Sequence, residues 1–188
     1  MTSLRKQLSM IAILGMFLLT ACNEDGTIAD PHANSNNSTA HEEMNHSSST
    51  RVVPDNLKTA DNPTFPTGSE AIIQTNHMES MDQAEAVISG AYQTTAYSVS
   101  YKPTTESETV WNHKWVVHEE LEDAGESPLE PGSKVILNAD HMKGMKGAEA
   151  TIEIAKDTTV YMVDFIPTNG DDEVMNHKWV IEDELTAR

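Results

Sequence analysis

The stretch GSEAIIQTNHMESMDQAEAVISGAYQTTAYSVSYKP, residues 68–103, returns 64 residues later as GSKVILNADHMKGMKGAEATIEIAKDTTVYMVDFIP, residues 132–167. The register continues without a gap to Leu121 over Leu185, and 25 of the 54 aligned positions are identical. Each copy then contains the word NHKW, at residues 112–115 and 176–179. Agreement of this extent at one fixed offset indicates an internal duplication.

Each copy has the pattern of β structure. In residues 95–101 the side chains of Tyr97, Val99 and Tyr101 alternate with small or polar ones, as a strand with one buried face requires. Short strands hide their edges by closing or packing, and a module of this size has a marginal core. We therefore predict an all-β fold of two tandem SH3-like barrel repeats that pack on each other, an analogy of layout. The predicted strands are 71–75, 84–91, 95–101 and 114–118 in the first repeat (67–124), and 134–138, 148–155, 159–165 and 178–182 in the second (125–188).

The chain begins with a pattern typical of an exported lipoprotein. Arg5 and Lys6 precede an apolar run at 8–19, which is too short to span a bilayer comfortably. The run ends in Leu-Thr-Ala-Cys at 19–22, which resembles a lipobox, so we predict a signal peptide over 1–21 and a lipid on Cys22. A plain secretory signal with an incidental cysteine is the alternative. Cys22 is the only cysteine, so neither an internal disulfide nor a cysteine metal cage is expected.

Residues 22–66 are rich in Asn, Ser, Thr and Pro and show no apolar periodicity, which predicts a disordered tether. Its His32, His41, Met44 and His46 are either loose metal ligands or ordinary linker residues. The chain carries a formal charge of −18, and loss of the two cationic signal residues makes it −18 − 2 = −20. Such a charge disfavours nucleic acid as a partner. We expect a protein held by lipid on the extracytoplasmic face of the cell membrane.

The repeated soft side chains are the candidates for a site. Thioether sulfur and imidazole nitrogen, without cysteine, suit Cu(I) best, whereas zinc and calcium favour other donor sets. We predict one copper site in each repeat, with Trp111, or Met175 at the same position of the second copy, as a cover over the metal. The predicted ligands are His77, Met78, Met81 and His113 in the first repeat, and His141, Met142, Met145 and His177 in the second.

A purely structural interpretation of the same residues also stands. The methionines would then fill barrel ends, and Trp115 and Trp179 are favoured as core residues over metal cover. The repeated acids Glu120 and Glu184 are interpreted as salt-bridge partners of the NHKW lysines. Nucleophile-elbow, zincin, P-loop and C-x-x-C motifs are missing from the sequence, so we do not expect an enzyme.

The lipobox, the doubled HMxxM and the doubled NHKWV together resemble the YdhK family of bacterial lipoproteins, which is defined by a tandem domain of unknown function. The resemblance covers residues 68–185. It implies a cell-surface protein that binds copper, since some members are linked to copper resistance, and it implies the repeated His and Met residues as ligands. The expected function is to sequester Cu(I) or to pass it to a membrane exporter. A metal-free module that binds cell-wall polymer or an envelope protein is the alternative.

Overall fold

The structure is a computed structural model that describes residues 49–188. The predicted signal peptide, Cys22 and the tether up to residue 48 lie outside the described residues. The all-β prediction is confirmed: besides strands, this part of the chain holds only two 3-10 helices, η1 (His118–Glu120) and η2 (Glu182–Glu184). None of its helices has the length and apolar character needed to cross a bilayer.

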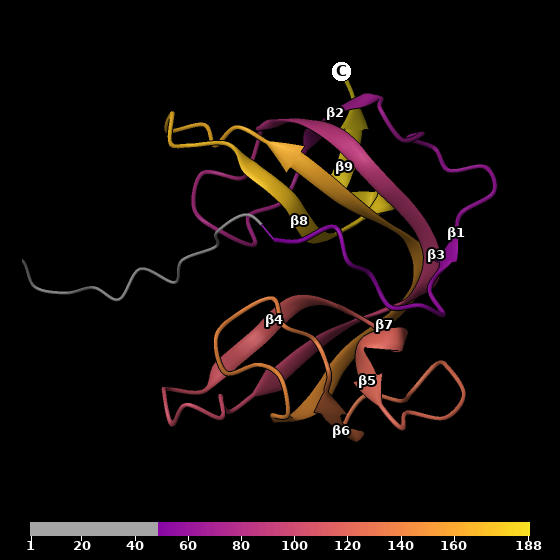
Figure 1. The fold of residues 1–188 in the computed structure, drawn as a ribbon, viewed down its shortest axis with the longest axis vertical. Coiled ribbons are helices and arrows are strands. Elements are labelled where there is room, and N and C mark those ends of the chain that lie inside the picture. The colour runs from indigo at the N-terminus through magenta and orange to yellow at the C-terminus, as the bar shows by residue number, and fades with distance from the viewer. Residues whose placement is uncertain (1–48) are drawn as a thin grey trace, which may run out of the picture. The chain divides into compact units, whose positions relative to one another are not determined.

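Two strands of 17 residues form the centre of the fold, β3 (Glu85–Tyr101) and β7 (Glu149–Phe165). They pair antiparallel along their whole length and run through both halves of the molecule (Figure 1). Each replaces two predicted strands, because the predicted break near residues 92–94 is continuous strand. Gln93 pairs with Thr159 and Thr94 with Thr158, so the paired strand continues the backbone hydrogen bonding where a break was predicted.

Four of the remaining strands pair with one half of a long strand each. The first half of β3 pairs with β2 and its second half with β4, and β7 pairs with β6 and β8 in the same way. Two short strands extend the sheet at its ends, since β9 pairs with β2 and β5 with β6. Their bounds are β1 (Lys58–Thr59), β2 (Glu70–Ile73), β4 (Val110–Val117), β5 (Leu121–Glu122), β6 (Lys134–Leu137), β8 (Val174–Ile181) and β9 (Leu185–Ala187).

The two sequence repeats interleave, so that each half of the molecule contains the start of one repeat and the end of the other. The first core joins Ile73 and Met81 to Phe165, and the second joins Val99 to Met145. A 17-residue strand is about 56 Å long at roughly 3.3 Å per residue, so it passes out of one small core and into the next. The tandem duplication is therefore present, but each core draws on both copies. The sheet is not closed, and the SH3-like barrel remains a prediction.

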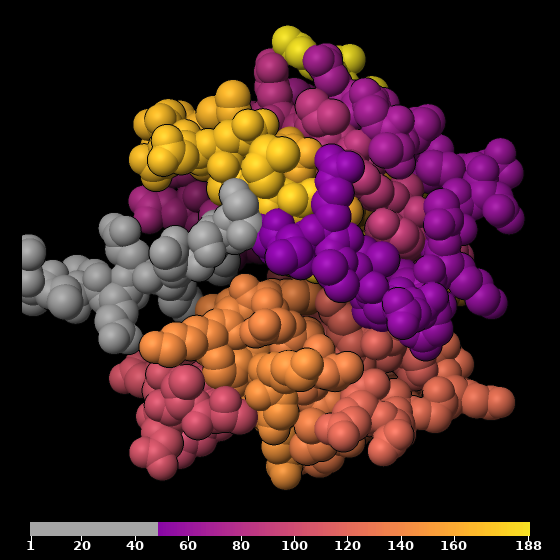
Figure 2. Space-filling view, viewed as in Figure 1, coloured from indigo at the N-terminus to yellow at the C-terminus, as the bar shows by residue number. Residues whose placement is uncertain are grey.

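A third core lies between the halves and is covered by the N-terminal strap, which we define as residues 49–60. Trp115 and Trp179 pack there with Leu57 of the strap, which is 8% exposed. Figure 2 shows the strap in indigo crossing the face of the molecule. Leu57 and Phe65 belong to the predicted tether, yet both are buried. Single apolar residues in a polar segment give no periodic signal, so only the cores that receive them reveal their role.

Candidate functional site

Each NHKW word forms a β-bulge that sends its histidine and its tryptophan to different places. Val99 pairs with His113 and Tyr97 with Val116, so β4 carries one residue more than β3 between these pairs. A second shift lies between the pairs Val99–His113 and Tyr101–Val110, and it contains Asn112 at φ 54°, a left-handed conformation that Asn adopts more readily than most residues. β8 has the same register shift and the same φ at its own Asn. The repeated word is therefore a structural device in both copies.

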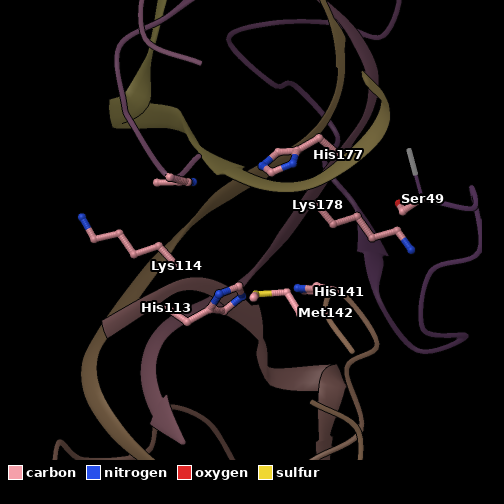
Figure 3. A pocket seen from close by; sticks show the side chains of 8 residues that line it. Ser49, His113, Lys114, His141, Met142, His177 and Lys178 are labelled. Atoms are coloured by element: carbon pink, nitrogen blue, oxygen red, sulfur yellow. The ribbon is translucent and has the colours of Figure 1, made fainter. Parts of the chain in front are cut away.

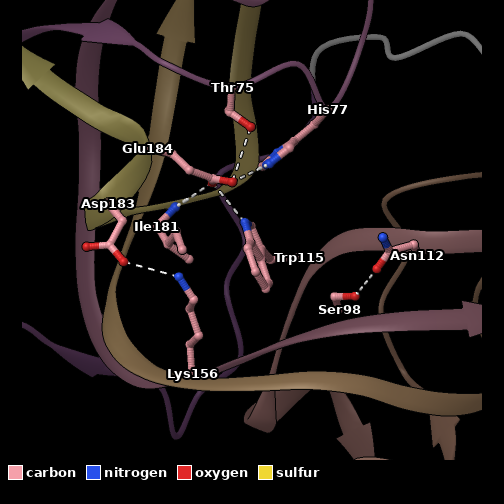
Figure 4. Close-up of polar contacts among 9 residues, drawn as sticks. All are labelled: Thr75, His77, Ser98, Asn112, Trp115, Lys156, Ile181, Asp183 and Glu184. Atoms are coloured by element: carbon pink, nitrogen blue, oxygen red, sulfur yellow. Dashed lines mark hydrogen bonds and ion pairs between the residues drawn. The ribbon is translucent and has the colours of Figure 1, made fainter.

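The Trp of the first NHKW holds a buried glutamate of the second repeat. Trp115 Nε1 donates to Glu184 Oε2 at 2.8 Å, and the backbone N–H of Ile181 donates to the same oxygen at 3.2 Å. On Oε1, His77 Nε2 lies at 2.8 Å and the hydroxyl of Thr75 donates at 3.2 Å (Figure 4). Burial alone would raise the pKa of Glu184, but the hydrogen bond and charge of His77, with the Trp115 and Ile181 bonds, lower it.

The second copy repeats this arrangement around Glu120. Trp179 Nε1 donates to Oε2 at 3.0 Å, the N–H of Val117 donates to the same oxygen at 3.1 Å, and His141 Nε2 lies 2.7 Å from Oε1. Burial again opposes ionisation, and His141, Trp179 and Val117 together lower the pKa of Glu120. These glutamates are therefore anchors for His and Trp side chains, and their interpretation as partners of the NHKW lysines was wrong. The sequence signal for these residues was that a glutamate occupies the same position in both repeats.

All four repeated histidines line one cavity, rather than one cavity in each repeat. The space measures about 30 Å³, which is room for a single ion or water. In Figure 3 the thioether of Met142 lies between the rings of His113 and His141, whose centroids are 6.0 Å apart. The lining residues are Ser49, His77, His113, Lys114, His141, Met142, His177 and Lys178.

Two of these rings have the hydrogen bonding that is usual for metal-ligating histidines. His77 and His141 each use Nε2 on a buried carboxylate, while the Nδ1 atom of each is buried and has no hydrogen-bond partner. A carboxylate on one ring nitrogen fixes the ring and raises the basicity of the other nitrogen. Across residues 49–188, no group of three or more His, Asp or Glu side chains is arranged to hold an ion. The soft and borderline donors that the cavity lining offers are imidazoles and one thioether.

The charges around the cavity balance. Lys114 and Lys178 line it, and the carboxylates of Glu120 and Glu184 hold two of its histidines. The ammonium of Lys114 lies over the Trp115 ring, 5.2 Å from its centroid, and that of Lys178 donates to a strap carbonyl. Burial lowers the pKa of Lys178, against the opposing charges of Glu120 and Asp140. The imidazole and thioether groups of the lining are borderline and soft donors, which suit a soft cation better than a hard one.

The other predicted site residues lie elsewhere. Met81 and Met145 are fully buried in the first and second cores, and Met78 packs against the first core. Trp111 is 75% exposed and lines a groove beside the cavity. Met175, its counterpart, is absent from the cavity lining and accepts a strap N–H with its backbone oxygen. Of the eight predicted ligands, the cavity thus gathers the four histidines and one methionine.

Comparison with known proteins identifies the repeat. The family model described as "Protein of unknown function (DUF1541)" matches residues 67–118 and 131–182. The "Uncharacterized protein YdhK" of Bacillus subtilis (strain 168) is 50% identical over 182 residues, which cover 96% of this chain and 88% of that protein. A crystal structure of a DUF1541 family protein (ydhK) from the same species shares 55% identity, with a TM-score of 0.75 over 79% of this chain and all of that one. A solution structure of the ydhK C-terminal domain has a TM-score of 0.62 at 57% identity, over 65% of this chain and 93% of that one.

Proposed function

Because this chain belongs to the DUF1541 family, whose description states no activity, we propose a function from the site itself. The protein binds one soft monovalent metal ion, Cu(I), in the cavity that the two repeats share. It acts by binding and not by catalysis. The observation that carries the proposal is the pair His77 and His141, which come from different repeats. Each is anchored to a buried glutamate and has an unpartnered Nδ1, and both line the cavity that also contains Met142.

The shared cavity replaces the expectation of one site in each repeat. Met142 lines it, whereas Met78, the same position of the first repeat, does not. The pseudo-symmetry of the fold is therefore broken in the donor set, and we propose one ion per chain. Neutral thioether and imidazole donors in a small cavity stabilise Cu(I), which limits its redox cycling and protects nearby thioethers from oxidation.

The sequence supplies the cellular setting of this proposal. The lipobox pattern ending at Cys22 supports a position outside the membrane with a lipid anchor. There it would sequester Cu(I), or pass it to a membrane exporter. The rival function is a metal-free envelope module that binds cell-wall polymer or protein, for which the same His and Trp residues are fold signatures.

The test is a titration of the chain from residue 23 onward with Cu(I) against a competing chelator. The competitor removes weak binding by the acidic surface, whose attraction for cations is not specific. We expect one ion per chain. Met142→Leu keeps volume and apolarity but removes the sulfur, and it should weaken binding at least tenfold. Met145→Leu is the matched control, because Met145 lies three residues away in the second core and does not line the cavity.

A second test removes one of the glutamates that hold the histidine rings. Glu184→Gln should weaken Cu(I) binding by about 10–100-fold, the usual effect of losing a carboxylate behind a metal-ligating histidine. Two ions per chain, or affinity indifferent to both Met142→Leu and Glu184→Gln, would contradict the shared site. No binding that survives the chelator would favour the envelope module.

A further inference from the structure

The edges of β4 and β8 are equivalent in sequence but differ in what covers them. Both carry the bulged NHKW word, and position 111 of β4 corresponds to position 175 of β8. Asn112 is exposed while Asn176 is half-buried, and Trp111 is 75% exposed while Met175 is half-buried. In the ladder of the described strands β4 pairs only with β3, which leaves its other edge open.

The N-terminal strap shows how the covered edge is used. The N–H of Ser49 donates to the carbonyl of Met175 at 2.9 Å, and the Asn176 side chain donates to the carbonyl of Ser49 at 3.0 Å. The Ser49 hydroxyl donates to the Asn176 carbonyl, and Lys178 Nζ donates to the carbonyl of Val52. These bonds use the backbone of the strap and one hydroxyl, and the Arg51 side chain adds a bond to Asn176 Oδ1. Apart from the hydroxyl and the Arg, they recognise peptide backbone with little demand on its sequence.

The open edge offers the same groups. Beside it lies a groove of about 380 Å³, and Trp111 forms its exposed aromatic wall. Asn112 and Lys114 stand where the second repeat has Asn176 and Lys178. One contact differs, because Asn112 Oδ1 already accepts the hydroxyl of Ser98, so that an Arg donating there as Arg51 donates to Asn176 would have to share this oxygen. The lining residues are Thr75, Asn76, His77, Val110, Trp111, Asn112, His113, Lys114 and Met142.

We propose that the β4 edge is a docking site for an extended segment of a partner protein, bound as the strap is bound on β8. Open strand edges with an exposed aromatic side chain bind peptides by adding a strand, with the aromatic group as the anchor. The segment presents a hydroxyl residue to Asn112 and a backbone carbonyl three residues later to Lys114. A second copy of this chain supplies its own strap only by stripping it from β8, which loses every bond formed there.

The position of the groove gives the docking a consequence. His77, His113, Lys114 and Met142 line both the groove and the cavity, so a docked segment covers the cavity on this side. Access to the cavity then depends on the partner. The docking itself needs no metal, and it can be tested independently of the copper proposal.

The test uses the full chain without metal and the capped peptide Ser-Thr-Arg-Val-Val-Pro-Asp, the strap sequence of residues 49–55, as the probe. The chain has three Trp residues, and Trp115 and Trp179 are buried, so a change in emission reports on Trp111. We expect a saturable blue shift. The same peptide with its serine N-methylated cannot donate to the Trp111 carbonyl, and it should bind about tenfold more weakly.

A dye-labelled probe followed by anisotropy adds a variant of the protein. Trp111→Ala alters an exposed side chain, leaves the cores intact and should weaken binding about tenfold. Three results would overturn the proposal. They are no response at millimolar peptide, a dimer that forms in solution and buries Trp111, or a Trp111 emission, obtained as the difference from the Trp111→Ala variant, that is already blue-shifted before peptide is added, which would mean that the chain fills its own groove.

Discussion

Trp115→Phe tests the link between the NHKW word and the buried glutamates. The change keeps an aromatic ring in the third core and removes the indole N–H that donates to Glu184 at 2.8 Å. A hydrogen bond to a charged group contributes about 1.5–3 kcal/mol. Because Ile181 still donates to the same oxygen, and His77 to the other, the carboxylate keeps partners and the loss falls in the lower half of that range. We expect destabilisation of about 2 kcal/mol.

The assay is equilibrium unfolding by urea at neutral pH, followed by circular dichroism, with thermal unfolding beside it. A loss of about 2 kcal/mol corresponds to a fall in Tm of roughly 4–8 °C for a domain of this size. Trp111→Phe is the matched control, since Trp111 lies on the same strand, is 75% exposed and should change stability by less than about 0.5 kcal/mol.

A double-mutant cycle with Glu184→Gln separates the hydrogen bond from ring packing. Residues in direct contact show coupling of about 0.5–3 kcal/mol. If Trp115→Phe proves as mild as the Trp111 control, or if the coupling to Glu184 is zero within error, the indole contact does not stabilise the fold and the reasoning fails.

Three further outcomes are expected. The pKa of Glu120 is lowered in the fold, so its ionised form contributes stability above about pH 4.5 that is lost as pH falls through the folded pKa. In urea unfolding across pH 3–6, the free energy of unfolding of Glu120→Gln should therefore depend less on pH than that of the unchanged protein. An unchanged slope would contradict this. Gly144→Ala should destabilise the protein more than Gly147→Ala does. Both glycines have φ 79°, but a Cβ at Gly144 would lie 2.8 Å from a neighbouring hydroxyl, whereas Gly147 faces open space. Equal Tm values for the two variants would count against this prediction. Burial raises the pKa of Tyr101 and Tyr161 to about 12. An absorbance titration should therefore show two of the four tyrosines ionising only near that pH. Ionisation of all four together near pH 10 would contradict this prediction.

The sequence alone predicted the duplication, the β class and most of the residues that line the cavity. The duplication followed from one fixed offset, and alternation along residues 95–101 gave the β class. Repetition marked the histidines that line the cavity, and it also marked Met81 and Met145, which fill cores instead. A repeated apolar or soft residue is preserved by packing and by ligation alike, so its sequence signal is the same in both cases.

The partners of those residues needed the tertiary structure. His77 and Glu184 are 107 positions apart, Trp115 and Glu184 are 69, and Trp179 and Glu120 are 59. No local sequence pattern predicts contacts between residues so far apart in the chain. These contacts form because β3 and β7 pair along their whole length and carry each repeat into both halves of the molecule. The sequence by itself determined a duplicated β protein with soft donors in each copy. Only the pairing of the two long strands decided that the donors meet in one cavity, since a strand longer than its own core must complete its packing in the next.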